Sequence, residues 1–427
     1  MKAVTINKVS RLPLLQPLAV RNFRLLFLGH CGSILGDQFY LIALPWLVYS
    51  LTGSSLMLGS VLLVSGAVRS AFLLMGGALS DRFSPRVLML TAYGLGALVT
   101  TLTALAVHLN ITERWHLFFL GGSFGLVEAT FFPAYQSATP MLISREQLIA
   151  GNSLLRSAVR LMGVIGPAIA GVVITKTGFT AAFVFDAASF VFAFFMISMI
   201  GTPTNADTGG TEDATAPPDC QPLLQSIVEG FRYTLRNRTL RTLFVYMIAF
   251  EFGAAGADYV GMPAFARLHF GQDEGAKALG AMASSLAAGL LIGMVMSGSL
   301  NAFKREDRVT TLMTLLMTCA ITSLAFATTL LPACVCLFAF GLASGAVSII
   351  IQARIQMTSD KRMLGRVMSI LMLGISLVEM AAFALSGILA DLNLRLVFLL
   401  GGLMMGVALL VWVGNQKRAA VDSIDES

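Results

Sequence analysis

The sequence predicts an all-α integral membrane protein with twelve membrane-spanning helices in two pseudo-symmetric bundles of six. Of its 427 residues, 56% are hydrophobic and only 12% are charged, whereas soluble domains contain roughly 25% charged residues. The apolar residues recur in blocks of about twenty, each long enough to cross a ~30 Å hydrocarbon core as a helix. The blocks are uninterrupted, and therefore unlike the alternating apolar and polar strands of an outer-membrane barrel.

The predicted spans fall into two groups of six. They cover residues 22–48, 56–80, 86–108, 115–138, 150–174 and 180–200, and then 242–265, 277–300, 309–331, 333–356, 367–390 and 395–414. Residues 201–221 between the groups are rich in Thr, Gly, Pro and Asp, and have too few apolar residues to form a core. We therefore expect an N-terminal bundle (1–200), a cytoplasmic linker (201–241), a C-terminal bundle (242–414) and a cytoplasmic tail (415–427).

The two groups resemble each other in sequence. FGLVEATFFPAYQ at 124–136 aligns without gaps to FGLASGAVSIIIQ at 340–352, and the same offset of 216 residues pairs Ser153 with Ser369 and Gly171 with Gly387. A single offset held over this length indicates a duplicated six-helix unit. Tandem repeats with a midplane site between them are the usual architecture of secondary transporters.

The end of the linker has the pattern of a helix that lies on the membrane surface. In residues 222–241 the apolar side chains Leu224, Ile227, Phe231 and Leu235 recur at helical spacing, and arginines cluster toward the end. We expect a basic connector that tethers the two bundles.

The positions of Lys and Arg predict the orientation, because cytoplasmic loops carry the excess of positive charge. With the N-terminus inside, twenty of these residues fall in cytoplasmic segments and five in outer loops. Both termini are therefore expected in the cytoplasm and the chain in the cytoplasmic membrane. The net charge of +6 then reflects topology, and we infer no nucleic-acid partner. No short apolar core with a small-residue cleavage site begins the chain, so we expect the first span to remain as an anchor.

Several classes of chemistry are not expected. Four of the five cysteines lie in or at the ends of spans, and the four histidines are scattered, so no disulfide framework or metal site is predicted. No GxxxxGK[ST] loop is present, and ATP is not the expected energy source. No nucleophile-and-base cluster indicates an enzyme, and no cofactor is expected.

Charged residues near the middle of the predicted spans are the main functional signal. Asp37 lies thirteen residues beyond Arg24, or ~20 Å from the cytoplasmic end at ~1.5 Å per residue. A charge at this depth costs on the order of 2.5–3.5 kcal/mol on insertion scales, so these side chains should face one another or a wet cavity. The full set is Asp37, Arg69, Glu128, Arg156, Arg160, Glu251 and Glu379.

These charges permit two interpretations. In the first they form satisfied pairs, Arg69 with Asp37 and Arg156 or Arg160 with Glu128, that only hold helices together. In the second some of the acids carry protons, because a buried carboxyl group without a nearby cation takes up a proton more readily. We hypothesise proton coupling, with Asp37 and Glu128 as the leading groups for coupling or substrate binding. Tyr40 is an aromatic candidate for the same cavity.

The loop after the second span resembles the signature of the major facilitator superfamily. In GALSDRFSPR, residues 77–86, the matching positions are Gly77, Leu79, Asp81, Arg82 and Arg86, while Ser84 and Pro85 replace a Gly and a basic residue. The resemblance implies a cytoplasmic gate at this loop, in which Asp81 pairs with basic residues or with the positive end of a helix from the other half. Arg366 is the expected partner, and a plain topological charge cluster is the alternative.

Narrower similarities point to one branch of the superfamily. RNFRLLFLG at 21–29, LGDQFYLIALPWLVY at 35–49 and EGFRYTLRNRTLR at 229–241 resemble macrolide-efflux-like and siderophore-exporter-like proteins. MGVIGPAIAG at 162–171 resembles the antiporter motif of the fifth helix, with Ala170 in place of a second Gly. Its small residues allow close helix approach and its proline allows a bend; they are Gly163, Gly166, Pro167 and Gly171.

The resemblance also orders the helices. It implies that the third, sixth, ninth and twelfth spans pack outside the cavity, and these spans contain no deep charge, with only Asp186 near the outer end of the sixth. The expected protein is a monomeric twelve-helix proton-coupled exporter of small organic molecules, either a siderophore or an amphipathic drug. A lysophospholipid or other metabolite transporter is an alternative, as is a membrane receptor that kept the fold and lost transport.

Overall fold

The structure, a computed structural model, describes residues 13–201, 223–299, 306–360 and 363–425, and these residues form helices and short connections without a strand. By their contacts the residues divide into two compact units. Unit 1 comprises residues up to Leu47 and Ala67–Ala216, and unit 2 comprises Val48–Gly66 and Pro217–Ser427. The segment Val48–Gly66, which contains the end of the first span and the beginning of the second, thus packs with the second half of the chain.

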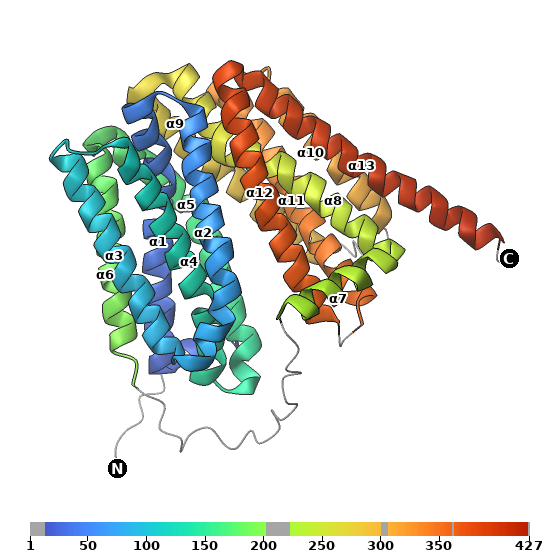
Figure 1. Ribbon diagram of the computed structural model, residues 1–427, viewed down its shortest axis with the longest axis horizontal. Coiled ribbons are helices and arrows are strands. Elements are labelled where there is room, and N and C mark those ends of the chain that lie inside the picture. Colours follow the sequence, from blue (N-terminus) through green and yellow to red (C-terminus); the bar gives the residue numbers. More distant parts are fainter. Residues whose placement is uncertain (1–12, 202–222, 300–305, 361–362, 426–427) are drawn as a thin grey trace, which may run out of the picture. The chain divides into compact units, whose positions relative to one another are not determined.

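Unit 1 is built from the helices of the first repeat (Figure 1). A short 3-10 helix, η2 (Pro13–Ala19), precedes them. The long helices are α1 (Arg21–Thr52), α2 (Ser55–Arg82), α3 (Pro85–His108), α4 (Arg114–Leu142), α5 (Leu148–Thr177) and α6 (Phe179–Ser198), with a 3-10 turn, η3 (Arg145–Gln147), before α5. The end of α1 from Val48 and the part of α2 up to Gly66 belong to unit 2. The helix ends agree with the predicted spans within a few residues, because apolar length in a membrane protein is set by the bilayer.

The start of α3 explains the unusual turn after the second span. The hydroxyl of Ser84 accepts a hydrogen bond from the Val87 N–H at 3.4 Å, and Pro85 occupies the first helical turn. A Ser cap followed by Pro is a strong helix start. Ser84 and Pro85, the two residues that depart from the superfamily signature, therefore form the N-terminal cap and the first residue of α3.

Unit 2 contains the linker helix and the second set of long helices. They are α7 (Leu223–Arg236), α8 (Arg238–Ala255), the π-helix η4 (Gly256–Gly261), α9 (Met262–Ser299), α10 (Glu306–Leu324), α11 (Leu330–Thr358), α12 (Leu364–Leu392) and α13 (Leu394–Asp425). Within α9 the backbone breaks at Gly271, whose φ of 67° suits glycine. The break separates the predicted spans 242–265 and 277–300.

Eleven of the described helical segments are long and apolar enough to cross a membrane. The predicted span 309–331 corresponds to α10, which is outside this set and contains Glu306, Asp307 and several threonines. In the sequence alone the span seemed longer, because the apolar residues after Leu324 continue it; the structure ends the helix there.

The linker helix α7 packs against α12 through a face that differs from the apolar stripe that predicted the helix. Gly230 and Thr234 are buried, and Gly230 lies against Ile370 and Arg366 of α12. Phe231 and Leu235, half of the predicted apolar stripe, remain exposed. An exposed apolar stripe beside arginines is what a helix at the bilayer interface requires.

Candidate functional site

A face of small residues on α1 positions Asp37. Gly29, Gly32 and Gly36 follow one another at helical spacing, and a Cβ on each would meet α6. At Gly32 that atom would lie 2.8 Å from the Phe192 ring. The two helices therefore approach closely along this face, and Asp37 is half-buried beside it.

Tyr40 is used for packing. Its ring lies flat on that of Phe124 of α4, with centroids 3.4 Å apart and an interplanar angle of 2°. The Tyr40 side chain is 9% exposed. The predicted cavity tyrosine thus ties α1 to α4 in unit 1.

Arg69 and Glu128 form an ion pair between α2 and α4. Arg69 Nη1 lies 3.4 Å from Glu128 Oε2, and the two side chains are 30% and 54% exposed. The structure thus joins Arg69 to Glu128, where the sequence alone had suggested Asp37 as the partner of Arg69 and an arginine of α5 as the partner of Glu128. The pairing differs because it depends on which helices are neighbours. The depth of a residue along its own helix does not give that information.

The two arginines of α5 lie on the surface of unit 1. Arg156 and Arg160 are exposed and are one turn apart, so they share a face of the helix. The two guanidinium groups therefore form one positively charged patch on the described surface of unit 1.

The predicted bend motif in α5 is only partly engaged. Gly166 lies against Gln38 of α1, since a Cβ there would be 2.8 Å from the Gln38 Cβ. Pro167 and Gly171 are buried, whereas a Cβ on Gly163 would meet nothing within 4 Å. The close approach therefore centres on Gly166.

Part of the predicted gate lies outside the described side chains, namely Gly77, Asp81 and Arg82. Arg86 donates from Nη2 to the carbonyl oxygen of Ser198 at 2.6 Å. A cation at the C-terminal end of α6 satisfies an unpaired carbonyl and complements the helix dipole. Arg86 thus joins α3 to α6 within unit 1.

Arg366, the expected partner of Asp81, binds the linker helix. Its Nη1 lies 2.6 Å from Glu229 Oε2 of α7. Beside this ion pair the Tyr233 hydroxyl accepts a hydrogen bond from the Asp360 N–H at 3.2 Å. Two polar contacts therefore hold α7 against the start of α12.

The acids of unit 2 include one that the sequence analysis missed. Glu251 on α8 and Glu379 on α12 are half-buried, as is Asp258 in η4. A π-helix inside a membrane helix is uncommon and frequently marks a functional site. The sequence GADYVG does not predict this π-helix, because the residue types of a π-helix do not differ from those of a regular α-helix.

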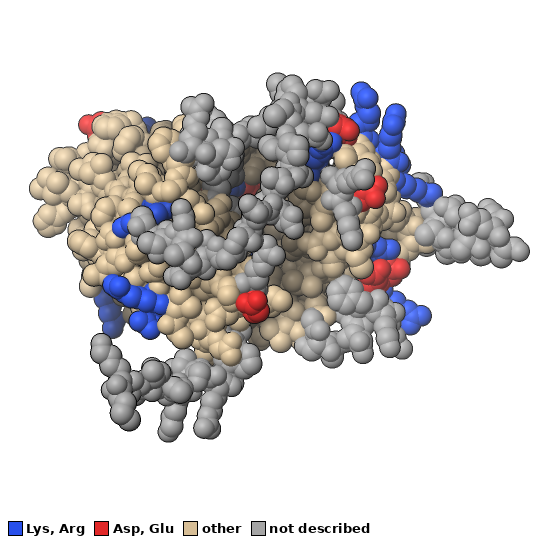
Figure 2. Space-filling view, turned by 90° about the horizontal axis from the view of Figure 1, so that it is seen from below, with Lys and Arg blue, Asp and Glu red and all other residues tan. Residues whose placement is uncertain are grey.

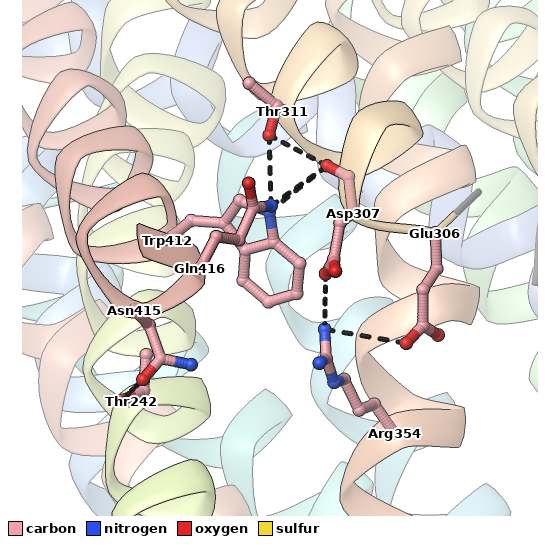
Figure 3. A network of polar contacts seen from close by, with 8 residues as sticks. All are labelled: Thr242, Glu306, Asp307, Thr311, Arg354, Trp412, Asn415 and Gln416. Carbon is pink, nitrogen blue, oxygen red and sulfur yellow. Dashed lines mark hydrogen bonds and ion pairs between the residues drawn. The ribbon is translucent and has the colours of Figure 1, made fainter. Parts of the chain in front are cut away.

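A polar network at one end of unit 2 was also missed (Figure 3). Arg354 of α11 lies 2.8 Å from Asp307 Oδ1 and 3.6 Å from Glu306 Oε1, and its guanidinium stacks on the ring of Trp412 at 5.0 Å. Gln416 donates to the Asp307 carbonyl at 3.1 Å. The network joins α10, α11 and α13. Arg354 escaped notice because it lies near the end of an otherwise apolar span.

A third missed group, Asp391, caps α2. Its Oδ1 accepts from the Ser55 N–H at 2.6 Å, and its Oδ2 accepts from the Ser54 hydroxyl at 2.6 Å and the Leu56 N–H at 3.1 Å. An acid at a helix N-terminus binds the free N–H groups and the positive dipole end.

Arg267 of α9 strengthens the same junction. It donates to the Gly53 carbonyl at 2.7 Å and stacks on the Tyr49 ring at 4.7 Å. The Tyr49 hydroxyl in turn donates to the Ser55 hydroxyl at 3.2 Å. We call Tyr49, Gly53–Leu56, Arg267 and Asp391 the α2 cap cluster.

Metal binding finds no support in the described part of the chain, where no group of three or more His, Cys, Asp or Glu could hold an ion.

Comparison with known proteins identifies relatives over most of the chain. Residues 13–425 match the family described as transmembrane secretion effector. The enterobactin exporter EntS of Shigella flexneri is 26% identical over 351 residues, which cover 81% of this chain and 79% of that protein. The same exporter from an Escherichia coli O1:K1 strain matches equally well, at 26% identity.

Solved structures show the same fold. A POT family transporter in complex with a thioalcohol-conjugated peptide has a TM-score of 0.72 at 13% identity and covers 93% of this chain and 96% of its own. A bacterial homologue of the iron transporter ferroportin in an inward-facing state has a TM-score of 0.64 at 15% identity, covering 92% and 98%. At such identities the likeness speaks for the fold alone, and it confirms the predicted all-α major facilitator architecture.

Proposed function

Because this chain belongs to the transmembrane secretion effector family of major facilitator transporters, we propose that it exports a siderophore across the cytoplasmic membrane by proton-coupled alternating access. Membership of the family carries the coarser statements: the protein is a multi-pass inner-membrane transporter of a small molecule and is not an enzyme. The substrate and the coupling ion are our proposal.

The exposed ion pair of Arg69 and Glu128 is the observation that carries the proposal. The two residues lie at the midpoints of α2 and α4, where each charge costs on the order of 2.5–3.5 kcal/mol if it faces lipid. Yet their side chains are 30% and 54% exposed. We infer from this exposure and this cost that the face borders water halfway across the membrane, as a transport path requires.

Surface arginines favour an anionic substrate. Arg156 and Arg160 are exposed one turn apart on α5, and guanidinium groups bind carboxylates and deprotonated hydroxyls with charge-assisted hydrogen bonds. A catecholate or hydroxyl-rich iron chelator fits this chemistry, and the 26% identical relative is named an enterobactin exporter. A cationic amphipathic drug would instead use Asp37 and Glu128. A lysophospholipid or another metabolite, and a receptor without transport, are the remaining alternatives.

Asp37 and Glu128 are the proposed proton-coupling groups. In an alternating-access antiporter the proton and the substrate occupy the same cavity in turn and not together. This exclusion couples the inward movement of the proton to the outward movement of the substrate. The signature loop with Asp81 serves as the cytoplasmic gate, and Glu251 and Glu379 contribute from the second repeat. We further propose a monomer with an N-terminal bundle at 1–200, a linker at 201–241, a C-terminal bundle at 242–414 and a tail at 415–427.

The proposed orientation has both termini in the cytoplasm, by the excess of Lys and Arg in alternate loops. Figure 2 shows Lys and Arg side chains at several places on the surface that is seen from below. Cysteine labelling from either side of the membrane tests this orientation directly.

Export from cells that lack their own siderophore exporters tests the function. The cells are loaded with a catecholate siderophore, a macrolide or a lysophospholipid, and the released compound is measured at two external pH values. The variants Asp37→Asn and Glu128→Gln should lose pH-dependent release, whereas Glu274→Gln should retain it. Glu274 is a matched control, because it forms an exposed ion pair with Lys277 at 3.2 Å on α9.

Each result has a clear consequence. Release of the siderophore but not of the macrolide supports the proposed substrate class. If both Asp37→Asn and Glu128→Gln retain proton-driven release, the coupling assignment is wrong. If no compound of the panel is released by the wild type at either pH, the receptor alternative gains the support that the exporter loses.

A further inference from the structure

Unit 2 contains a cavity of about 390 Å³ at the end of α12 that lies opposite to α7. Its lining comes from α9, the end of α10, the turn between α12 and α13, and the first turns of α13. Small-molecule sites usually have volumes of roughly 300–1,000 Å³. Of the described residues that line the cavity, none is a charged residue proposed for transport, so this is a different site.

Aromatic rings form the inner wall of this cavity. Phe265 and Phe398 are each 1% exposed, and their rings pack edge to face with centroids 6.4 Å apart. The His269 ring stacks on Phe265 at 4.2 Å, and His269 Nδ1 donates to the Phe265 carbonyl oxygen at 3.1 Å. Because a carbonyl oxygen only accepts, this contact leaves Nε2 as the ring atom that can bind a ligand. A flat aromatic body suits such a wall.

The rim of the cavity offers a positive charge. Arg395 lines the cavity and is exposed, and its backbone N–H donates to Asn393 Oδ1 at 3.0 Å, which fixes the turn that carries it. Asp391 also lines the cavity, but its carboxylate oxygens accept three hydrogen bonds from the start of α2. The charge that is left for a ligand is therefore positive, and the polar end of a bound molecule should be anionic.

We propose that this cavity binds a small aromatic carboxylate, whose ring lies against Phe265 and Phe398 and whose carboxylate pairs with Arg395. A guanidinium group binds a carboxylate through two parallel N–H···O bonds, which fixes the orientation of the ligand. His269 Nε2 is the acceptor for a hydroxyl group on the ligand ring. The site does not depend on the proposed export of a siderophore.

Binding of benzoate to the full-length protein in phosphatidylcholine nanodiscs tests the proposal, measured by saturation-transfer NMR with empty nanodiscs as the blank. Benzoate should bind more tightly than benzyl alcohol, which has the same ring without the charge. Arg395→Gln should weaken binding roughly tenfold or more, since hydrogen bonds to a charged group are lost. Arg114→Gln is the matched control and should bind benzoate as the wild type does, because Arg114 is likewise exposed at a helix start but belongs to unit 1.

Hydrogen exchange in the wild type locates the site without any variant. The Asn393 N–H is hydrogen-bonded to the Leu389 carbonyl oxygen and the Arg395 N–H to Asn393 Oδ1, so both amides exchange only when the turn opens. Benzoate at ten times its Kd should slow their exchange about tenfold, because it binds the closed turn.

Four outcomes would overturn the proposal. Equal binding of benzoate and benzyl alcohol would show that the anion is not recognised, and unchanged binding in Arg395→Gln would show that this guanidinium group does not hold it. Exchange at Asn393 and Arg395 that bound benzoate leaves unaltered would place the site elsewhere. Displacement of benzoate by phosphatidylglycerol added to the nanodiscs would identify a lipid headgroup as the occupant.

Discussion

Removal of the Asp391 carboxylate should loosen the start of α2. The α2 cap cluster holds the first turn of that helix through three hydrogen bonds to Asp391, from Ser54, Ser55 and Leu56, at 2.6, 2.6 and 3.1 Å. Loss of a helix-capping side chain costs about 1 kcal/mol, and loss of a negative charge near a helix N-terminus costs about 0.3–1 kcal/mol. Because Asp391 is exposed, solvent screening keeps the sum for Asp391→Ala at about 1–2 kcal/mol.

Hydrogen exchange measures this local free energy directly. A loss of about 1–2 kcal/mol raises the open fraction roughly 5–30-fold, and the amides of Ser55 and Leu56 should exchange faster by that factor when exchange follows local opening. Asn393→Ala is the matched control. The Asn393 side chain accepts from the Arg395 N–H at 3.0 Å and has no part in the α2 cap cluster, so exchange at the start of α2 should stay at the wild-type rate.

The α2 cap cluster lies entirely within unit 2, which includes the segment Val48–Gly66. Unchanged exchange of Ser55 and Leu56 in Asp391→Ala would refute the assigned role of the carboxylate.

Three further predictions address other contacts. Arg354→Lys keeps the charge but loses the planar stack on Trp412 and the two-acid contact, so the melting temperature should fall by the equivalent of about 1–3 kcal/mol; an unchanged melting temperature would contradict the network's role. Glu229→Arg should release α7 and speed its limited proteolysis, and the added exchange Arg366→Glu should restore protection; failure of the double exchange would show that the pair does not hold the helix. Gly59→Val adds a side chain where the α12 backbone approaches, and overpacking of about 1–3 kcal/mol should lower thermal stability, while a stable variant would exclude that close approach.

Sequence reasoning reached part of the candidate site. Arg69 and Glu128 stood out because charges in the middle of apolar spans are costly and few. Their pairing did not follow, since depth along each helix says nothing about which helices are neighbours. Tyr40 illustrates the same gap, because an aromatic residue on a membrane helix has the same pattern whether it lines a cavity or stacks on Phe124.

Asp186 shows that the expected place of a helix in the bundle does not decide where each of its side chains points. The resemblance implies that this helix packs outside the cavity, with Asp186 near its outer end. The structure instead turns it toward Gly36 of α1. The spacing of Gly29, Gly32 and Gly36 was visible in the sequence as a signal for a closely packed neighbour, but the identity of that neighbour was not.

The sequence by itself determined most of the membrane helices and the family, because a bilayer sets helix length and leaves the backbone of an apolar segment no alternative to internal hydrogen bonding. It did not determine the early end of α10 or the π-helix η4. Only the tertiary structure decided which charges meet: Arg69 with Glu128, Arg366 with Glu229, Asp391 with the start of α2, and Asp186 with the glycine face of α1. The physical reason is that these contacts join residues far apart in the chain. Their geometry depends on helix rotation and on closeness of approach, and residue type and spacing along one helix specify neither.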